Sequence, residues 1–211
     1  KAKYYKLKGD LLQHDRNYGA AFIAYEASND AVKASSEYQR HKDGAERYFQ
    51  EKKSMLRQLR KRLEQAPYHN KNVVQRQQLA FLIGFPRSGT TLLDNILRSH
   101  SRIDVVEEQP MLARALSTVK NPQDLTSIEQ MDEVTFALAC EIYFEELEKH
   151  ILRLDSAIVI DKLPLNILEL PMIKQLFPNA KFIFAVRHPL DCILSCWMQT
   201  FKLNPAMANM L

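Results

Sequence analysis

Residues 79–93 read LAFLIGFPRSGTTLL, and the prediction of the fold starts from this segment. Its first five residues, 79–83, are all apolar, and a short apolar run followed by turn residues is typical of a buried strand in a parallel sheet. Residues 84–89 then predict a tight loop, and the apolar residues after Thr90 recur at helical spacing. The order of strand, glycine-containing loop and helix start predicts backbone N–H groups gathered at a helix N-terminus, where an anion is favoured.

The loop differs from the nucleotide-binding P-loop, GxxxxGK[ST], at one informative position. Gly84, Gly89 and Thr91 match the pattern, but Thr90 takes the place of the lysine. A nucleoside triphosphatase uses that lysine on its β- and γ-phosphates. Here the cation lies inside the loop instead, as Arg87, whose planar guanidinium suits a terminal phosphate or sulfate group. The loop is therefore P-loop-like, and it predicts an oxyanion site that takes its charge from arginine.

Three other segments are predicted to be strands of the same sheet. They are residues 103–106, 157–160 and 181–186, each short and rich in apolar side chains. Strands that alternate with helical patterns indicate an α/β protein with a parallel sheet. The expected fold is therefore a P-loop-like parallel sheet flanked by helices.

A charged side chain follows each of the four strand candidates. These side chains are Arg87, Glu108, Lys162 and Arg187. The carboxyl ends of parallel strands meet at one edge of a sheet, and ligands of such sheets bind there. The four residues are therefore expected to share one site.

Residues 1–66 precede this sheet and are predicted to be an α-helical, repeat-like segment. Small and large side chains follow the order of a tetratricopeptide repeat, at Gly9, Leu12, Tyr18, Ala21 and Tyr25. One repeat cannot bury its own face, so either further repeats precede it or the pair packs on the next domain. A plain helical hairpin is the alternative. Residues 67–78 are polar and predict a linker to the α/β domain, residues 79–211.

Composition excludes several classes of function. The net charge of +4 suits an anionic ligand but is too small to indicate nucleic-acid binding. No apolar run is long enough for a membrane-spanning helix, and no signal-peptide pattern is present, which favours a cytoplasmic location. The 3 cysteines and 6 histidines show no ligand spacing, so neither a disulfide framework nor a metal site is predicted.

The heptapeptide PRSGTTL, residues 86–92, resembles the 5′-phosphosulfate loop of sulfotransferases that use 3′-phosphoadenosine-5′-phosphosulfate. The likeness is greatest to tyrosylprotein sulfotransferases and to bacterial relatives fused to tetratricopeptide repeats, and it covers residues 79–203 closely and 1–66 loosely. The resemblance implies that this compound is the co-substrate and that no metal is needed. It also implies a set of loop residues that bind the donor: Pro86, Arg87, Ser88, Gly89, Thr90 and Thr91.

The resemblance implies the catalytic residues as well. Arg87 and Lys162 are expected to neutralise charge on the leaving oxygen, although Lys162 begins Lys-Leu-Pro where relatives have Lys-Asp-Pro. Glu108 corresponds to the second glutamate of a Gly-Glu-Glu-Thr segment, where that residue is the general base; here the segment is Val-Glu-Glu-Gln. Because side chains alternate along an extended chain, Glu107 is expected to face the opposite side.

A clamp for the 3′-phosphate is implied by Arg187 and Ser195. In the family an arginine ends a strand and a serine follows eight residues later, in the next helix, and this chain has the same spacing. Family members continue beyond the point at which this chain ends. The resemblance therefore implies that residues 79–211 form the N-terminal part of a sulfotransferase domain and that the fold is C-terminally incomplete.

Two other functions stay open. A P-loop kinase or nucleotidase would need a lysine at Thr90 and a magnesium-binding acid, for which Asp161 is the candidate. A nucleotide-binding repeat protein without activity is the second alternative. For a sulfotransferase, a protein tyrosine, a sugar hydroxyl and a small amine all suit as acceptors. The helical repeats imply a protein or peptide partner, and neither nucleic acid nor a membrane is an expected partner.

Overall fold

The computed structural model describes residues 1–63, 78–122, 124–153 and 155–210, and the segment predicted as a linker lies almost wholly outside this part of the chain. Contacts divide the chain into two compact units. One contains Lys1–Lys53 and His188–Leu211, and the other contains Ser54–Arg187. The sequence instead predicts that residues 79–211 form one domain. The contacts do not test this domain boundary, so it stays a prediction.

The first unit is helical, as predicted for the N-terminal segment. Helices α1 and α2 lie close together because Gly9 leaves room for the Tyr25 ring: a Cβ on Gly9 would be 2.7 Å from its Cε1. The Tyr25 hydroxyl lies 2.8 Å from Oδ1 of Asp10, to which it donates a hydrogen bond. The elements of this unit are α1 (Ala2–His14), α2 (Tyr18–Lys33), the first part of α3 (Ser36–Leu63), α9 (Pro189–Trp197) and η2 (Met207–Met210).

The second unit contains a four-stranded sheet in the order β2-β3-β1-β4, with every neighbouring pair parallel. This confirms the predicted α/β class. The strands are β1 (Gln78–Gly84), β2 (Ile103–Glu107), β3 (Ile158–Lys162) and β4 (Lys181–Ala185). The helices are α4 (Thr90–Arg98), α5 (Met111–Leu116), α6 (Leu125–Glu129), α7 (Glu133–Glu148), η1 (Pro164–Glu169) and α8 (Leu170–Leu176).

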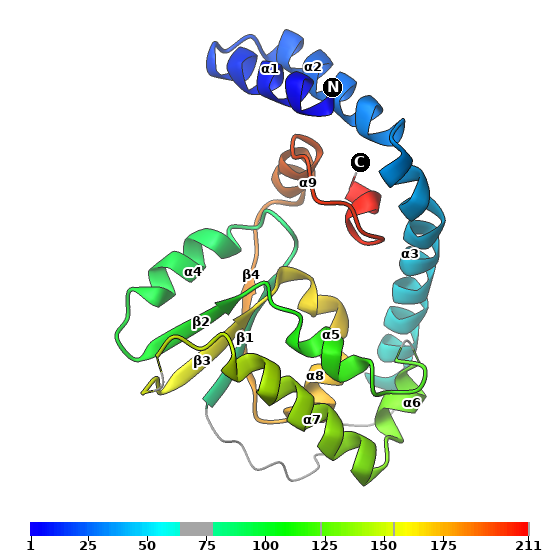
Figure 1. The fold of residues 1–211 in the computed structure, drawn as a ribbon, viewed down its shortest axis with the longest axis vertical. Coiled ribbons are helices and arrows are strands. Elements are labelled where there is room, and N and C mark those ends of the chain that lie inside the picture. The colour runs from blue at the N-terminus through cyan, green and yellow to red at the C-terminus, as the bar shows by residue number, and fades with distance from the viewer. Residues whose placement is uncertain (64–77, 123, 154, 211) are drawn as a thin grey trace. The chain divides into compact units, whose positions relative to one another are not determined.

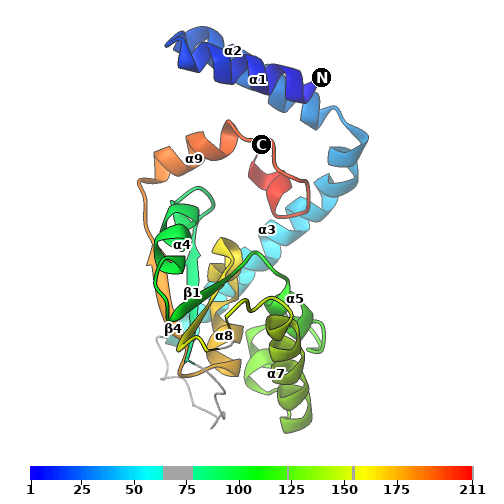
Figure 2. The same cartoon turned by 60° about the vertical axis from the view of Figure 1, so that its left-hand side comes forward.

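Helices cover both faces of the sheet, as Figures 1 and 2 show. Alternate residues of β1 supply the two cores: Phe81 packs on the side of α7 and α8, and Leu82 packs on the side of α4. The Phe81 ring lies 6.1 Å from that of Phe177 and 6.2 Å from that of Tyr143. Because β1 is central and buried on both faces, it reads as the continuous apolar run seen in the sequence.

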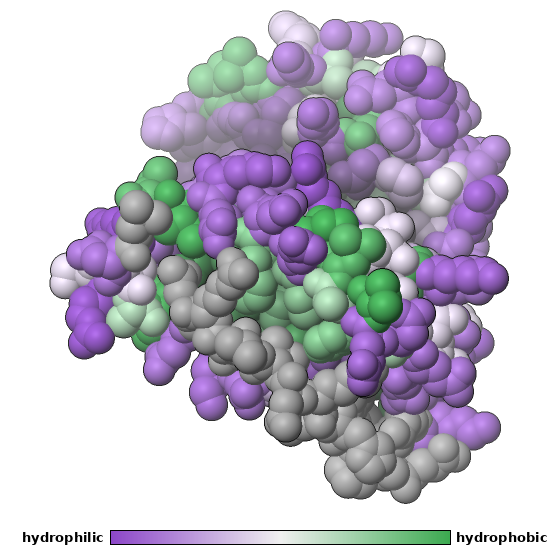
Figure 3. Space-filling view, turned by 60° about the horizontal axis from the view of Figure 1, so that its bottom comes forward, coloured by the Kyte–Doolittle hydropathy of each residue, from purple (hydrophilic) through white to green (hydrophobic). Residues whose placement is uncertain are grey.

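The surface is mixed. Figure 3 shows one face of the molecule, on which hydrophilic residues prevail and hydrophobic residues form smaller areas. Large apolar side chains are nevertheless exposed on α4, at Leu92 and Ile96. In the part of the chain that the structure describes, no helix is long and apolar enough to cross a membrane.

A polar cluster lies inside the larger core, at the end of β3. The carboxyl of Asp161 is fully buried and accepts hydrogen bonds from the Tyr143 hydroxyl at 2.9 Å and from Nδ2 of Asn166 at 3.4 Å. Burial raises the pKa of Asp161 to about 7, although the Tyr143 hydrogen bond opposes this. Asp161 therefore ties α7 and η1 to the strand that ends in Lys162.

The raised pKa of Asp161 predicts a stability that falls with pH. Between its ordinary value of 3.8 and about 7, the folded state binds the proton more tightly than the unfolded state. The stability that Asp161 contributes through this proton is therefore fully present below pH 3.8, and it is lost as the pH rises through about 7. Asp161→Asn should abolish the dependence, so wild type should lose on the order of 2–3 kcal/mol relative to the variant between about pH 5 and 8.

Urea denaturation followed by far-ultraviolet circular dichroism at several pH values measures this difference. An equal pH dependence in wild type and Asp161→Asn would contradict a neutral, buried Asp161. Exchange of the exposed Asp155 for Asn is the matched control, and it should leave the pH dependence unchanged.

Candidate functional site

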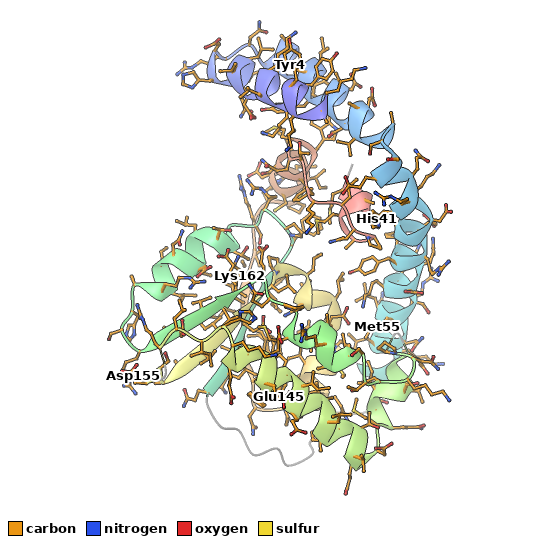
Figure 4. All side chains as sticks on the ribbon, in the orientation of Figure 1. Tyr4, His41, Met55, Glu145, Asp155 and Lys162 are labelled. Atoms are coloured by element: carbon orange, nitrogen blue, oxygen red, sulfur yellow. The ribbon has the colours of Figure 1, made fainter. Side chains whose placement is uncertain are left out.

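The carboxyl ends of β2 and β3 bring three charged side chains together. Glu107 and Lys162 are paired residues of the two strands. The Lys162 ammonium donates to Oε1 of Glu107 at 2.6 Å and to Oε1 of Glu108 at 3.2 Å. The lysine side chain is 0% exposed, whereas the carboxylates are 46% and 58% exposed. Figure 4 labels Lys162 at this edge of the sheet. The ammonium is thus buried behind two carboxylates that reach solvent.

The expectation that Glu107 and Glu108 face opposite sides is wrong. Alternation requires an extended backbone at both residues, and Glu108 has φ 51°, in the left-handed region. Its N–H still donates to the carbonyl of Lys162 at 2.8 Å. The chain therefore stays beside β3 while it turns, and this turn brings both carboxylates to one ammonium.

A second ion pair lies behind Glu107. Arg98 of α4 donates through Nε to Oδ1 of the buried Asp94, and its Nη2 lies 3.9 Å from Oε2 of Glu107. The hydrogen bond from Lys162 lowers the pKa of Glu107, and the charges of Lys162 and Arg98 add to this against the effect of burial. Sequence reasoning missed Asp94 and Arg98. Their spacing of four residues in a predicted helix was the available signal.

Glycine is required where β1 enters the loop. A Cβ on Gly84 would lie 2.7 Å from the carbonyl oxygen of Ala185 and 2.8 Å from Oγ of Ser88. The loop that follows turns sharply, with positive φ at Arg87 (68°) and at Gly89 (97°). The loop is therefore folded against the end of β4, which no larger residue at Gly84 would allow without a shift of backbone.

The residues of this loop fit an oxyanion. Helix α4 begins at Thr90, and among the described residues no side chain caps its N-terminus at Gly89. The first N–H groups of a helix have no intrahelical partner. The hydroxyl of Ser88 is buried and has no hydrogen-bond partner in the described part of the chain. An orphaned hydroxyl beside uncapped N–H groups is what a bound phosphate or sulfate oxygen would satisfy.

Arg187 lies against the same loop. It follows β4 by two residues, and its Nη1 donates a hydrogen bond to the carbonyl of Arg87 at 3.3 Å. The sheet register places this pair at the same edge as the lysine, because Leu82 of β1 is paired with Lys162 and β1 enters the loop two residues later. Arg87, Glu108, Lys162 and Arg187 thus lie at one edge, as the sequence predicts.

The remaining expected residues are placed as follows. Pro86 and Thr90 are buried, and Thr91 is exposed in the first turn of α4. Ser195 lies in α9, which belongs to the unit that contains the N-terminal helices. Its pairing with Arg187 in a clamp stays a prediction. Among the described residues, no group of three or more His, Cys, Asp or Glu side chains is arranged to hold a metal ion.

Comparison with known proteins identifies the family. A model of the sulfotransferase family matches residues 80–209. The chain belongs to this family. An uncharacterized protein of Aquifex aeolicus (strain VF5) is 28% identical over 203 residues, which is 90% of this chain and 25% of that protein. Protein-tyrosine sulfotransferase 1 of Homo sapiens is 32% identical over 117 residues, 52% of this chain and 31% of that protein, and the Mus musculus protein gives the same values.

The chain therefore spans about a quarter to a third of the length of these relatives. The family match begins in β1 and extends through α9. It thus includes the loop, the strand ends and Ser195, so every residue that the sequence analysis assigns to the site lies inside the region of family similarity.

Because Ala185 and Ser88 lie so close to Gly84, adding one methyl group at this position is predicted to lower the stability of the folded protein. In Gly84→Ala the Cβ would meet backbone and a buried side chain, and such overpacking costs about 1–3 kcal/mol. Gly19→Ala is the matched control, because nothing lies within 4 Å of that position and alanine favours a helix. Urea denaturation should therefore show a loss for Gly84→Ala only. Equal stability of the two variants would mean that the loop is not packed against β4.

Proposed function

We propose that this chain contributes the donor-binding loop and the general base of a sulfotransferase that uses 3′-phosphoadenosine-5′-phosphosulfate. The single observation that supports it most is that the Glu108 carboxylate lies 3.2 Å from the buried Lys162 ammonium, beside the strand that enters the oxyanion loop. Family membership supports sulfuryl transfer as the reaction. The donor would supply the sulfuryl group and leave as adenosine 3′,5′-bisphosphate.

Each residue has a defined part in this proposal. The acceptor oxygen or nitrogen forms a bond to sulfur as the bond between sulfur and the leaving phosphate oxygen breaks. Glu108 takes the acceptor proton. Lys162 and Arg87 stabilise the negative charge that develops on the leaving oxygen. The N-terminus of α4 and the Ser88 hydroxyl hold the 5′-phosphate, while Arg187 binds the 3′-phosphate.

The kinase or nucleotidase alternative loses its metal ligand. Asp161 was the candidate acid, but its carboxyl is fully buried among Tyr143 and Asn166. It therefore faces the core and lies away from the exposed carboxylates of the strand ends. With threonine at position 90, the described loop also lacks the lysine that a P-loop kinase uses on its β- and γ-phosphates.

A protein tyrosine is the acceptor that we propose. The relatives from Homo sapiens and Mus musculus are named protein-tyrosine sulfotransferases, and the aligned region is half of this chain. Glu108 is 58% exposed, so a residue that protrudes from a polypeptide can reach it without passing through a closed cavity. A tyrosine hydroxyl ionises near pH 10, and a general base lowers the cost of its deprotonation in the transition state.

The base assignment predicts a loss of rate without a loss of donor affinity. Glu108→Gln keeps the shape of the side chain but removes its basicity, so sulfuryl transfer to a tyrosine peptide should fall about 10²–10⁴-fold. Affinity for adenosine 3′,5′-bisphosphate should stay within about twofold, because the carboxylate faces the acceptor. The assay uses the full-length protein with radiolabelled donor, and Glu141→Gln, an exposed glutamate of α7, is the control. An unchanged rate in Glu108→Gln would refute the assignment.

The 3′-phosphate clamp predicts a specific change in nucleotide preference. Wild type should bind adenosine 3′,5′-bisphosphate more tightly than adenosine 5′-phosphate, and in Arg187→Ala this preference should shrink about 10- to 100-fold, as expected for loss of a charged hydrogen-bond donor. Isothermal titration calorimetry measures both affinities. Arg102→Ala, an exposed arginine before β2 at the other end of the sheet, should keep the preference. A preference that survives in Arg187→Ala would place the 3′-phosphate elsewhere.

A further inference from the structure

Five charged side chains form a continuous row of ion pairs, with alternating sign, at the edge of the sheet. The row begins with Asp94 and Arg98 in α4 and continues with Glu107 at the end of β2. It ends with Lys162 at the end of β3 and Glu108 after β2. The proposed function uses only its last two members. The other three have no part in donor or acceptor binding, so their arrangement needs its own explanation.

Lys162 is held more closely by Glu107 than by the proposed base. The ammonium lies 2.6 Å from Oε1 of Glu107 and 3.2 Å from Oε1 of Glu108. Glu107 is also the register partner of Lys162 in the ladder, so the backbones of both strands fix this pair. Glu108 lies beyond the strand, after a turn in the backbone. Glu107 is thus the fixed partner of the ammonium, and Glu108 is the more exposed one.

A completely buried ammonium requires compensation by an opposite charge. If Glu108 were the sole partner of Lys162, its carboxylate would be committed to that ion pair, and a carboxylate committed to a cation is a weaker base. Because Glu107 supplies the closer contact, the Glu108 carboxylate is less committed to the ammonium and stays available for the acceptor proton. A neighbouring negative charge, such as that of Glu107, also makes a carboxylate a stronger base.

Arg98 keeps Glu107 in place. Its guanidinium faces Oε2 of Glu107, the oxygen that does not bind Lys162, and its own orientation is fixed by the buried Asp94. The two carboxylate oxygens of Glu107 therefore face two different cations, one from α4 and one from β3.

We infer that Glu107 is a positioning residue of the proposed sulfuryl transfer: it holds the Lys162 ammonium and leaves Glu108 available as the base. The inference rests on the proposed function for its role in the reaction, and on the ion pairs alone for the arrangement itself. Asp94 and Arg98 support Glu107 from α4. Glu107 thus acts through Lys162 and Glu108 and does not touch the acceptor.

The test is the pH dependence of Glu107→Gln. Without the Glu107 charge, Lys162 should pair with Glu108 alone and lower its pKa. The acidic limb of the kcat/KM profile should move to lower pH by on the order of one unit, and kcat at neutral pH should fall about 10-fold because the base is weaker. A residue that only maintained the fold would lower the rate without moving this limb.

A second measurement needs no activity. Titration of ¹³C-labelled glutamate carboxyls by NMR, in the full-length protein without ligand, should show that Glu108 in Glu107→Gln titrates at a lower pH than in wild type. Glu141→Gln, the exposed control, should leave Glu108 unchanged. If the Glu108 titration in Glu107→Gln stays where it is in wild type, the inference is overturned.

The two readouts separate this inference from the proposed function. A wild-type protein that transfers no sulfuryl group would refute the proposed function and with it the role of Glu107 in that reaction, while a shifted Glu108 titration would still establish that Glu107 controls its basicity. Active wild type with an unshifted titration in Glu107→Gln would overturn the inference and leave the proposed function intact.

Discussion

The buried ammonium of Lys162 is the interaction on which the site depends. Its side chain is 0% exposed, and an isolated charge at such a position would be severely destabilised. The cost is offset by Glu107 and Glu108, and this requirement fixes how β2 and β3 end relative to each other. The left-handed backbone of Glu108 follows from the same requirement, because only a turn there brings the second carboxylate to the ammonium.

Strand β3 serves two environments with two successive residues. Asp161 enters the core and is bound by Tyr143 and Asn166, whereas Lys162 faces the carboxylates at the strand end. Side chains alternate along a strand, so an anchored Asp161 fixes the direction in which Lys162 leaves the sheet. The packing of α7 and η1 against the core is thereby connected to the geometry of the site, which lies on the opposite side of the strand.

The sequence predicts the strands because each contains a short apolar run, although β3 extends through Asp161 and Lys162, two residues past the predicted end at 160. The run at 79–83 lies inside β1, Gln78–Gly84, and the segment 103–106 lies inside β2, Ile103–Glu107. The pairing of Glu107 with Lys162 was not predictable, because it depends on the strand order β2-β3-β1-β4, which joins residues 55 positions apart. The prediction that Glu107 and Glu108 face opposite sides is wrong for a local reason. Glu108 has a positive φ, and at a residue other than glycine such a φ has no signal in composition or periodicity.

The charges at the strand ends differ between the two halves of the sheet, acidic at β2 and β3 and basic at β1 and β4, and the proposed reaction uses both halves. The row of ion pairs at β2 and β3 has three carboxylates, Asp94, Glu107 and Glu108, and two cations, Arg98 and Lys162. This half of the sheet edge therefore suits the removal of a proton and repels an anionic donor. The ends of β1 and β4 carry Arg87, Arg187 and the N-terminus of α4, all of which attract anions. In the proposed reaction an anionic donor is therefore drawn to the β1 and β4 half, and the acceptor proton is removed in the half that carries Glu108.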